Sequence, residues 1–415
     1  MQSHFQALEI AIVGAGLAGL LAARVLREHH KVTVYERGSR AFEVGAAINV
    51  GPNGVKILDQ LGFDRTLVGS LSAEAMKIYS KDGVLIDDRL ISPAKDYGAD
   101  WLFQHRADLR DEFLRLATAE SASLGIPGAP ATVRWSSEVV SVDVEEGILL
   151  LASGEEIKAD VLIGADGIKS VVRPYVVGDA AFTTARPSGL SAFRFTIDAD
   201  TIKANLNEIP AIMDSTKPAS LAVVDSYDGS KRSLVIYPCR NFELLNFGCI
   251  CPDDMLQASA TESWTATGDK EEMLSIFHDF PEWVLRLLRL ASNLRLWQLR
   301  DQDPLPNYVK GRTVLIGDAA HAMTPHQGQG GTQAVEDAEG FRLLLASDVT
   351  YEVVPQLLRD WDSVRRPRAS QIQNHTRKSV LRKSAEDIAR FERYNWTYPG
   401  IHKALRQVKA GEPLI

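Results

Sequence analysis

Residues 10–26 of the chain read IAIVGAGLAGLLAARVL, and a second apolar run follows at residues 31–35. The run at 10–13 predicts a buried strand, and the pattern at 17–26 predicts an apolar helix. A strand, a turn with GxGxxG spacing, a helix and a second strand form the βαβ unit of dinucleotide-binding sheets. The sequence therefore predicts a Rossmann-like domain in the first part of the chain.

Each glycine of this motif has its own physical task. Gly14 permits a tight turn, Gly16 lets a pyrophosphate approach the N–H groups at the helix N-terminus, and Gly19 lets helix and strand pack closely. Glu36 ends the second strand, where its carboxylate can accept hydrogen bonds from both ribose hydroxyls. These residues predict FAD or NAD. The alternative is that the glycines serve only a tight βα turn.

Length and charge limit the class of protein. A chain of 415 residues is too long for one ordinary core and should hold two or three domains. Its 46 Lys and Arg face 54 Asp and Glu, a net charge of -8, so no basic surplus is present to bind nucleic acid. The cysteines Cys239, Cys249 and Cys251 match neither a disulfide framework nor a zinc site. A reducing compartment fits them best.

No signal peptide is recognisable near Met1, and no stretch reaches the roughly 20 apolar residues that span a bilayer. We therefore expect a soluble cytoplasmic protein without a membrane partner. No group of residues suggests a metal site.

Later segments show how the domains are arranged. Apolar runs at 159–163 and 313–316 each lead into a Gly and an Asp, as buried parallel strands that feed loops do. Because they lie far from the first βαβ unit, we expect a discontinuous domain made of residues 1–75, 95–180 and 297–345.

The intervening material alternates between apolar and polar residues. This pattern predicts antiparallel strands at residues 191–197, 221–224, 233–239 and 244–249. Helical spacing follows at 273–290, and beyond Gly331 the chain reads as helices broken at Pro355, Pro367 and Pro399. We expect an α/β fold with an inserted antiparallel-sheet substrate domain (76–94 and 181–296) and a C-terminal helical segment (346–415).

Two further motifs separate FAD from NAD. Asp166-Gly167 follows one predicted strand, and Gly317-Asp318 follows another and leads through a Gly-rich stretch at 325–331 into a helix. A pure NAD dehydrogenase needs neither motif. With them, the chain resembles the single-component FAD-dependent aromatic hydroxylases, the family of 4-hydroxybenzoate, salicylate and 6-hydroxynicotinate monooxygenases. Within it, the chain is most similar to the fungal phenol-dearomatising monooxygenases, from about residue 10 to 341.

The resemblance implies a discontinuous Rossmann-like FAD-binding domain that holds FAD non-covalently, with NADPH or NADH as co-substrate. Oxygen from O2 would reach an electron-rich phenolic substrate through a flavin C4a-hydroperoxide, with or without dearomatisation. The expected setting is secondary metabolism or aromatic catabolism, and the expected assembly is a monomer or homodimer.

The resemblance also assigns cofactor contacts. Glu36 would bind the adenosine ribose, Asp318 the ribityl chain, and Asp166 with Arg173 a loop linked to both FAD and NAD(P)H. Caps of turns or helices are the alternative for the two aspartates. Glycines before the helix at Gly331 can present N–H groups to the flavin pyrimidine, where negative charge develops on reduction. The expected cofactor-binding set is Gly14, Gly16, Gly19, Glu36, Arg37, Ala47, Arg106, Asp166, Asp318 and Gly331.

On the substrate side, alternation in 191–197 places Arg194 on one face with Ala192 and Thr196, and three apolar side chains on the other. Fungal members resemble this arrangement, with such an arginine holding a phenolate. A guanidinium suits an oxyanion and lowers the pKa of the phenol. A structural salt bridge is the alternative for Arg194.

Tyr237 and His326 complete the predicted catalytic set. Tyr237 shares a strand face with Ser233 and Val235 and would orient the substrate, or else belong to the core. Several relatives carry a histidine where this chain has Ser233, which weakens base catalysis from that position. His326, in the loop before Gly331, would steer or deprotonate the substrate, with loop packing as the alternative.

Two other functions stay open at this point. One is an FAD-dependent oxidase, halogenase or reductase on the same fold, although the sequence lacks the Trp-x-Trp-x-Ile-Pro halogenase signature. The other is a non-catalytic flavin-bound redox partner protein. Labelled oxygen in the product and substrate-stimulated NAD(P)H consumption separate these alternatives from a monooxygenase.

Overall fold

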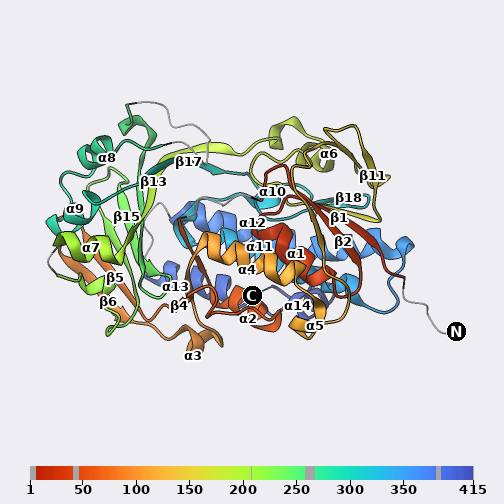
Figure 1. The fold of residues 1–415 in the computed structure, drawn as a ribbon, viewed down its shortest axis with the longest axis horizontal. Coiled ribbons are helices and arrows are strands. Elements are labelled where there is room, and N and C mark those ends of the chain that lie inside the picture. The colour runs from red at the N-terminus through yellow and green to blue at the C-terminus, as the bar shows by residue number, and fades with distance from the viewer. Residues whose placement is uncertain (1–5, 41–45, 207, 258–266, 380–384, 415) are drawn as a thin grey trace.

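The computed structural model describes residues 6–40, 46–206, 208–257, 267–379 and 385–414 (Figure 1). Two large sheets organise these residues. The first carries the predicted βαβ unit, and the second carries the predicted substrate strands. The domain boundaries expected from the sequence stay a prediction.

The first sheet has six strands in the order β18-β19-β12-β1-β2-β8. All neighbours run parallel except β18 and β19. The four predicted strands are confirmed, because apolar runs buried on both faces suit a parallel sheet. The bounds are β1 (Glu9–Val13), β2 (Lys31–Tyr35), β8 (Thr132–Arg134), β12 (Val161–Gly164), β18 (Val309–Lys310) and β19 (Thr313–Leu315).

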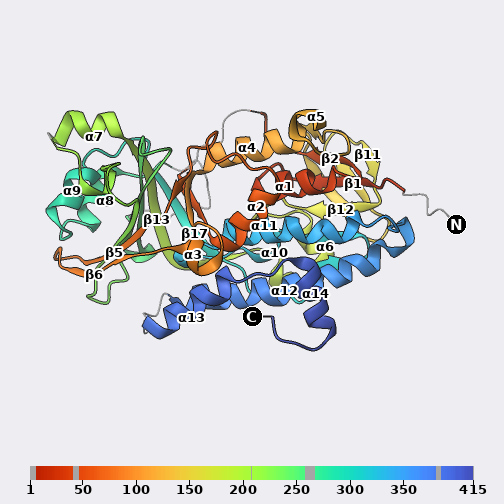
Figure 2. The same ribbon diagram turned by 90° about the horizontal axis from the view of Figure 1, so that it is seen from below.

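Helices cover this sheet. Helix α1 lies between α4 and α11 and packs against both (Figure 2). Nearly every α1 side chain is buried, which explains why its sequence is apolar all round rather than on one face. The bounds are α1 (Leu17–Leu26), α2 (Pro52–Gln60), α4 (Arg106–Thr118), α5 (Ser121–Leu124), α6 (Arg173–Val177), α10 (Asp318–His321) and α11 (Gly330–Gly340).

The second sheet has seven strands in the order β17-β13-β16-β15-β14-β5-β6. The four predicted strands are all present and pair antiparallel with one another, and β14 also pairs in parallel with β5. Strand β5 arrives from a remote segment, and a long connection permits a parallel neighbour. The bounds are β5 (Ala75–Ser80), β6 (Leu85–Leu90), β13 (Arg186–Asp198), β14 (Ser220–Asp225), β15 (Ser233–Cys239), β16 (Leu244–Pro252) and β17 (Arg295–Asp301).

The two faces of this sheet differ as the alternation predicts. Phe193, Phe195 and Ile197 belong to an apolar core with the helices α7 (Ala199–Leu206), α8 (Lys270–Ile276) and α9 (Glu282–Leu288). Arg194 has the opposite parity and lies on the other face, which we call the inward face. The single helix expected at 273–290 is two helices, because Pro281, which has no N–H, precedes α9.

Two smaller sheets lie outside these layers. Strand β7 (Leu102–His105) pairs with β3 (Ala47–Val50) and β4 (Leu71–Ser72), and the short helix α3 (Pro93–Tyr97) precedes it. The other small sheet contains β9 (Val139–Asp143), β10 (Ile148–Leu151) and β11 (Glu156–Lys158).

The C-terminal part is helical, with α12 (Val354–Ser379), α13 (Ala385–Trp396) and α14 (Ile401–Lys409). The expected break at Pro367 is wrong, since α12 continues through it. Arg365 and Arg368 flank the proline and bind buried carboxylates of α11, which holds the helix together across the missing N–H bond. Among the helices that the structure describes, none is long and apolar enough to cross a membrane.

Candidate active site

The glycine turn between β1 and α1 has the predicted shape. Gly14 has a φ of +104°, and a Cβ there would meet the carbonyl oxygen of Ala165 at 2.5 Å. A Cβ on Gly19 would collide with the carbonyl oxygen of Gly14. A Cβ on Gly16 would meet nothing within 4 Å. Two glycines are thus required by packing, and Gly16 faces open space at the start of α1, where a phosphate group fits.

Glu36 lies beside this turn. Its Oε2 accepts a hydrogen bond from Ala15 N–H at 2.8 Å, and its Oε1 accepts one from Gly38 N–H at 2.7 Å. Arg37 is exposed next to it. Because a carboxylate has about four acceptor sites, Glu36 can support the turn and still accept from a ribose.

The turn after β19 brings Asp318 to the same place. Gly317 has a φ of +59°, and a Cβ there would lie 2.9 Å from Cβ of Ala18 in α1. Asp318 is half-buried, and no group in the described residues donates a hydrogen bond to its carboxylate. The carboxylate is therefore available to a ligand hydroxyl.

Asp166, by contrast, has its own partners. Its carboxylate accepts from the Ser170 hydroxyl at 2.6 Å and from the Val171 N–H at 2.6 Å. Burial raises its pKa. These contacts fit the alternative that Asp166 caps its own turn. A contact of Asp166 with the cofactor stays a prediction. The Arg173 guanidinium donates to backbone oxygens of three segments, namely Gly167 and Ile168, Thr183, and Asp318 and Ala319.

Ala47, Arg106 and Gly331 meet around the small sheet of β3 and β7. Ala47 pairs with His105, and the N–H of Arg106 binds the Ala46 oxygen at 3.2 Å. A Cβ on Gly331 would lie 2.7 Å from Cδ1 of Ile48. These three residues thus lie close to one another around strand β3.

Arg194 extends from the inward face of the seven-stranded sheet. Its guanidinium lies 4.7 Å from the centre of the Trp297 ring. In the described part of the chain it makes no hydrogen bond or ion pair, so the salt-bridge alternative finds no support. Burial lowers its pKa. A guanidinium without a hydrogen-bond partner in the protein can bind an anionic oxygen.

Tyr237 lies near Arg194 and is only 3% exposed. Its ring centre is 4.8 Å from that of Phe103, within an apolar cluster that also holds Trp101 and Trp396. Burial raises the pKa of Tyr237, and Arg194 opposes that effect. The hydroxyl therefore stays protonated and able to donate a hydrogen bond.

His326 lies elsewhere on the inward side. It lines a cavity of about 1030 Å³, together with Leu190 and Thr324. Arg194 and Tyr237 do not line this cavity, and Ala192 lies between Leu190 and Arg194 along the face of β13. Burial lowers the pKa of His326 to about 4, so the imidazole is neutral at neutral pH.

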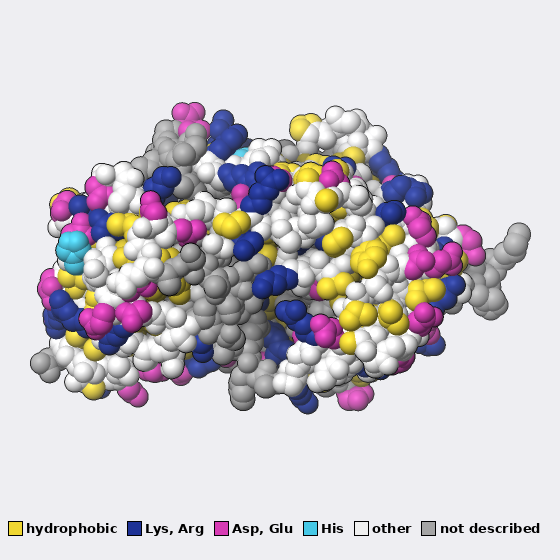
Figure 3. Space-filling model, turned by 90° about the horizontal axis from the view of Figure 1, so that it is seen from above, with side chains coloured by type: hydrophobic (Ala, Val, Ile, Leu, Met, Phe, Trp, Pro, Cys, Tyr) yellow, Lys and Arg dark blue, Asp and Glu magenta, His cyan; other side chains and the backbone are white. Residues whose placement is uncertain are grey.

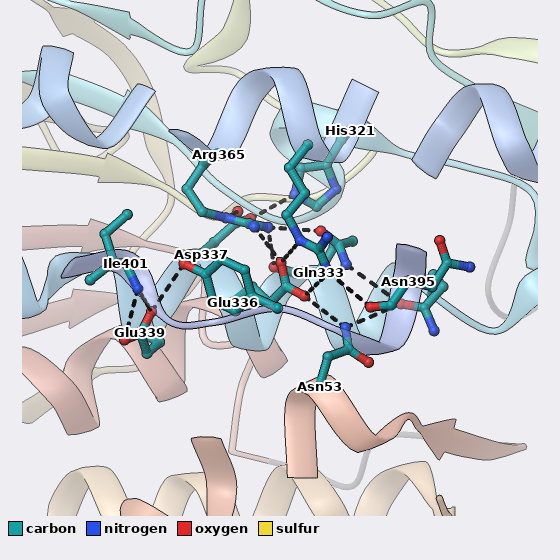
Figure 4. A network of polar contacts seen from close by, with 12 residues as sticks. Asn53, His321, Gln333, Glu336, Asp337, Glu339, Arg365, Asn395 and Ile401 are labelled. Carbon is teal, nitrogen blue, oxygen red and sulfur yellow. Dashed lines mark hydrogen bonds and ion pairs between the residues drawn. The ribbon is translucent and has the colours of Figure 1, made fainter. Parts of the chain in front are cut away.

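Behind the turn that carries Asp318 lies a buried charge network (Figure 4). Arg365 and Arg368 bind the Glu336 carboxylate, and Arg365 also binds Asp337. His321 contacts Asp337 at 2.6 Å. The sequence analysis did not single out these carboxylates and arginines. The available signal was an adjacent Glu and Asp in a helix whose neighbours are apolar.

The surface adds one observation. Lys and Arg side chains gather along the middle of the face shown in Figure 3, between the parts built on the two large sheets. This arrangement suits the approach of anionic ligands.

Comparisons with known proteins agree with this geometry. The family model described as "FAD binding domain" matches residues 7–376. Hispidin-3-hydroxylase of Neonothopanus nambi is 32% identical, over 89% of this chain and 87% of its own. FAD-dependent monooxygenase cfoG of Aspergillus candidus is 33% identical, over 88% and 84%. A salicylate hydroxylase solved with substrate has a TM-score of 0.75 and 26% identity, and the match covers 97% of this chain and 98% of that one. The chain therefore belongs to the family of FAD-dependent monooxygenases and aromatic hydroxylases.

Proposed function

We propose that this enzyme hydroxylates an electron-rich phenol, with NADPH or NADH and O2 as co-substrates. The observation that carries the proposal is Arg194, a half-buried guanidinium without a hydrogen-bond partner in the described chain, beside the hydroxyl-bearing Tyr237. This pair suits a substrate that is anionic at one oxygen and aromatic beyond it.

The residues around the glycine turn fit FAD. The open space at Gly16 takes the pyrophosphate, Glu36 takes the ribose, and Asp318 takes hydroxyls of the ribityl chain. When bound and reduced by NAD(P)H, FAD supplies the activation of O2. No side chain of the predicted cofactor-binding set is suited to attach FAD covalently, so acid precipitation should release the yellow chromophore. Chromophore that stays with the pellet would contradict non-covalent binding.

Arg194 prepares the substrate for oxygen transfer. A guanidinium next to the phenol oxygen favours the phenolate and lowers its pKa, which raises the electron density of the ring. Tyr237 donates a hydrogen bond that fixes the orientation of the ring, and the aromatic cluster around it excludes water. His326 lines a cavity that Arg194 and Tyr237 do not line, so its neutral imidazole would act on a part of the substrate that reaches into that cavity, by accepting a proton or by steering from the loop side.

Labelled oxygen gas provides the direct test. The purified holoenzyme is given a panel of electron-rich phenols while NAD(P)H consumption and product mass are followed. We expect some phenols to accelerate NAD(P)H oxidation and to gain one labelled oxygen atom. Peroxide without labelled product would support the oxidase alternative. No acceleration by any phenol would support a redox partner protein.

We also propose a cytoplasmic location and a monomeric or homodimeric state. Cys239, Cys249 and Cys251 are buried free thiols, which suits a reducing compartment. Sedimentation of the purified protein tests the second part of this proposal.

A further inference from the structure

The turn that carries Asp318 is held at both ends by one carboxylate. Oδ2 of Asp337 accepts a hydrogen bond from the N–H of Gly317 at 2.9 Å, and it contacts Nε2 of His321 at 2.6 Å. Gly317 and His321 flank Asp318 on either side. A single oxygen atom of α11 therefore fixes where the turn begins and where it ends.

Asp337 is itself held rigidly. Its Oδ1 accepts from Nε of Arg365 at 3.0 Å, and its backbone oxygen accepts from the Trp361 indole at 3.1 Å. Burial opposes ionisation of Asp337, but His321 and Arg365 outweigh it and lower its pKa. The carboxylate is thus charged, and α12 fixes its orientation through Arg365 (Figure 4).

The surroundings of His321 decide which of its ring nitrogens donates to Asp337. Its Nδ1 is buried and has no hydrogen-bond partner among the described residues. A proton on Nδ1 would leave a buried donor unsatisfied, whereas a proton on Nε2 is donated to Asp337. Nε2 is therefore the ring nitrogen that donates to the Asp337 carboxylate.

We propose that Asp337 is a positioning residue for the cofactor: it orders the turn 317–321 so that the Asp318 carboxylate points to the flavin ribityl chain before FAD arrives. A preformed acceptor loses less conformational entropy on binding than a mobile one. The inference rests on the proposed role of Asp318. The buried charges of Asp337 and Arg365 would then contribute to FAD affinity as well as to the stability of the fold.

Glu336 offers a matched control. It is adjacent in sequence, equally buried, and bound by Arg365 and Arg368. Asn53 also donates to it at 2.7 Å. However, no hydrogen bond joins Glu336 to the turn 317–321 in the described structure. A substitution there disturbs the same network without releasing the turn.

The experiment compares the FAD dissociation constants of apoproteins by flavin fluorescence and their melting temperatures. We expect Asp337→Asn to raise the dissociation constant about tenfold or more, because the amide has one acceptor oxygen instead of two. If that oxygen faces Gly317 and His321, the NH2 group meets the Arg365 donor, and if it faces Arg365, the turn loses both of its contacts. Glu336→Gln should lower the melting temperature about as much as Asp337→Asn does, but it should change the FAD dissociation constant by less than about threefold. Equal loss of FAD affinity in both variants would overturn the proposal.

A second pair of variants leaves the carboxylate in place and decides the matter if Asp337→Asn does not fold. His321→Gln keeps a donor at the position of Nε2 and should bind FAD almost as the wild type does. His321→Ala removes the donor and should bind FAD several-fold more weakly. Identical affinities in the two would overturn the proposal. Asp318→Ala tests separately the assumption that Asp318 binds FAD. Unchanged FAD affinity in that variant would remove Asp318 from the site.

Discussion

The buried network behind the Asp318 turn and the inward face of the seven-stranded sheet both contain arginines away from bulk water. In the network, Arg365 is fully buried and binds Glu336, Asp337 and Gln333. On the inward face, Arg194 is half-buried, lies near the Trp297 ring and Tyr237, and makes no hydrogen bond or ion pair in the described chain. The first arginine is saturated with partners, and the second is not.

This difference separates structural from ligand-binding residues. A buried charge without a partner is costly, so folding alone would not retain one. The charges of Glu336, Asp337, Arg365 and Arg368 compensate one another and link α11 to α12. Arg194 lacks such compensation, which supports our proposal that its partner is a ligand.

The largest expected effect is on stability. Arg365→Met should lower the free energy of unfolding by about 3–5 kcal/mol, because buried Asp337 loses its guanidinium partner and buried Glu336 keeps only Arg368. Denaturant unfolding measures this change, and Arg365→Lys, which keeps the charge, should lose less. A loss below about 1 kcal/mol in Arg365→Met would erase the distinction between the two arginines.

The matching substitution on the inward face should act on function instead. Arg194→Met should reduce product formation about 100-fold, the loss of a charge-assisted hydrogen bond to the phenolate. FAD should stay bound, the stability should change by less than about 1 kcal/mol, and peroxide should replace product. Normal coupling and a normal KM would show that Arg194 does not hold the substrate.

A smaller effect is expected next to it. Tyr237→Phe keeps the ring in its apolar cluster and removes one hydrogen bond, so kcat should fall about tenfold or the product should lose selectivity. Melting temperature serves as the control and should be nearly unchanged. If rate, coupling and product match the wild type while His326→Ala alone is inactive, the histidine carries the role that we give to Tyr237.

The smallest effect concerns pH. The pKa of His326 is lowered to about 4, below the ordinary value of about 6.5, so its neutral form favours the folded state. This contribution is present above pH 6.5 and is lost as pH falls, by about 1.4 kcal/mol for each pH unit until the folded-state pKa near 4 is reached. His326→Gln lacks the imidazole, so its free energy of unfolding should fall less than that of the wild type between pH 6.5 and pH 4.

The pKa of His375 is also lowered to about 4, so this histidine affects stability over the same pH range. Because it is present in both the wild type and His326→Gln, its effect cancels when the two are compared. Only the difference between the two stability profiles reports on His326. Identical profiles would mean that His326 is solvated. The same lowering moves the expected inflection in turnover from about 6.5, the value for an unperturbed imidazole, to about 4.

Much of the fold was predictable because its signals are local. The first βαβ unit and strand β15 have the predicted bounds within a residue, since alternation and apolar runs depend on neighbouring positions. The parallel pairing of β14 with β5 and the continuity of α12 through Pro367 were not predictable. Both depend on segments that are distant in sequence.

For the site, the sequence was enough to place glycines, aspartates and Arg194 at strand ends and faces, because backbone geometry fixes which residue types a turn or a pleated strand accepts. Only the tertiary structure decided which of these groups already have partners. It shows Asp166 occupied by its own loop, Asp318 and Arg194 open, and His326 at a separate cavity. The charge pairs behind the turn join residues 29 positions apart, as in Arg365 with Glu336, and no local pattern specifies such a contact.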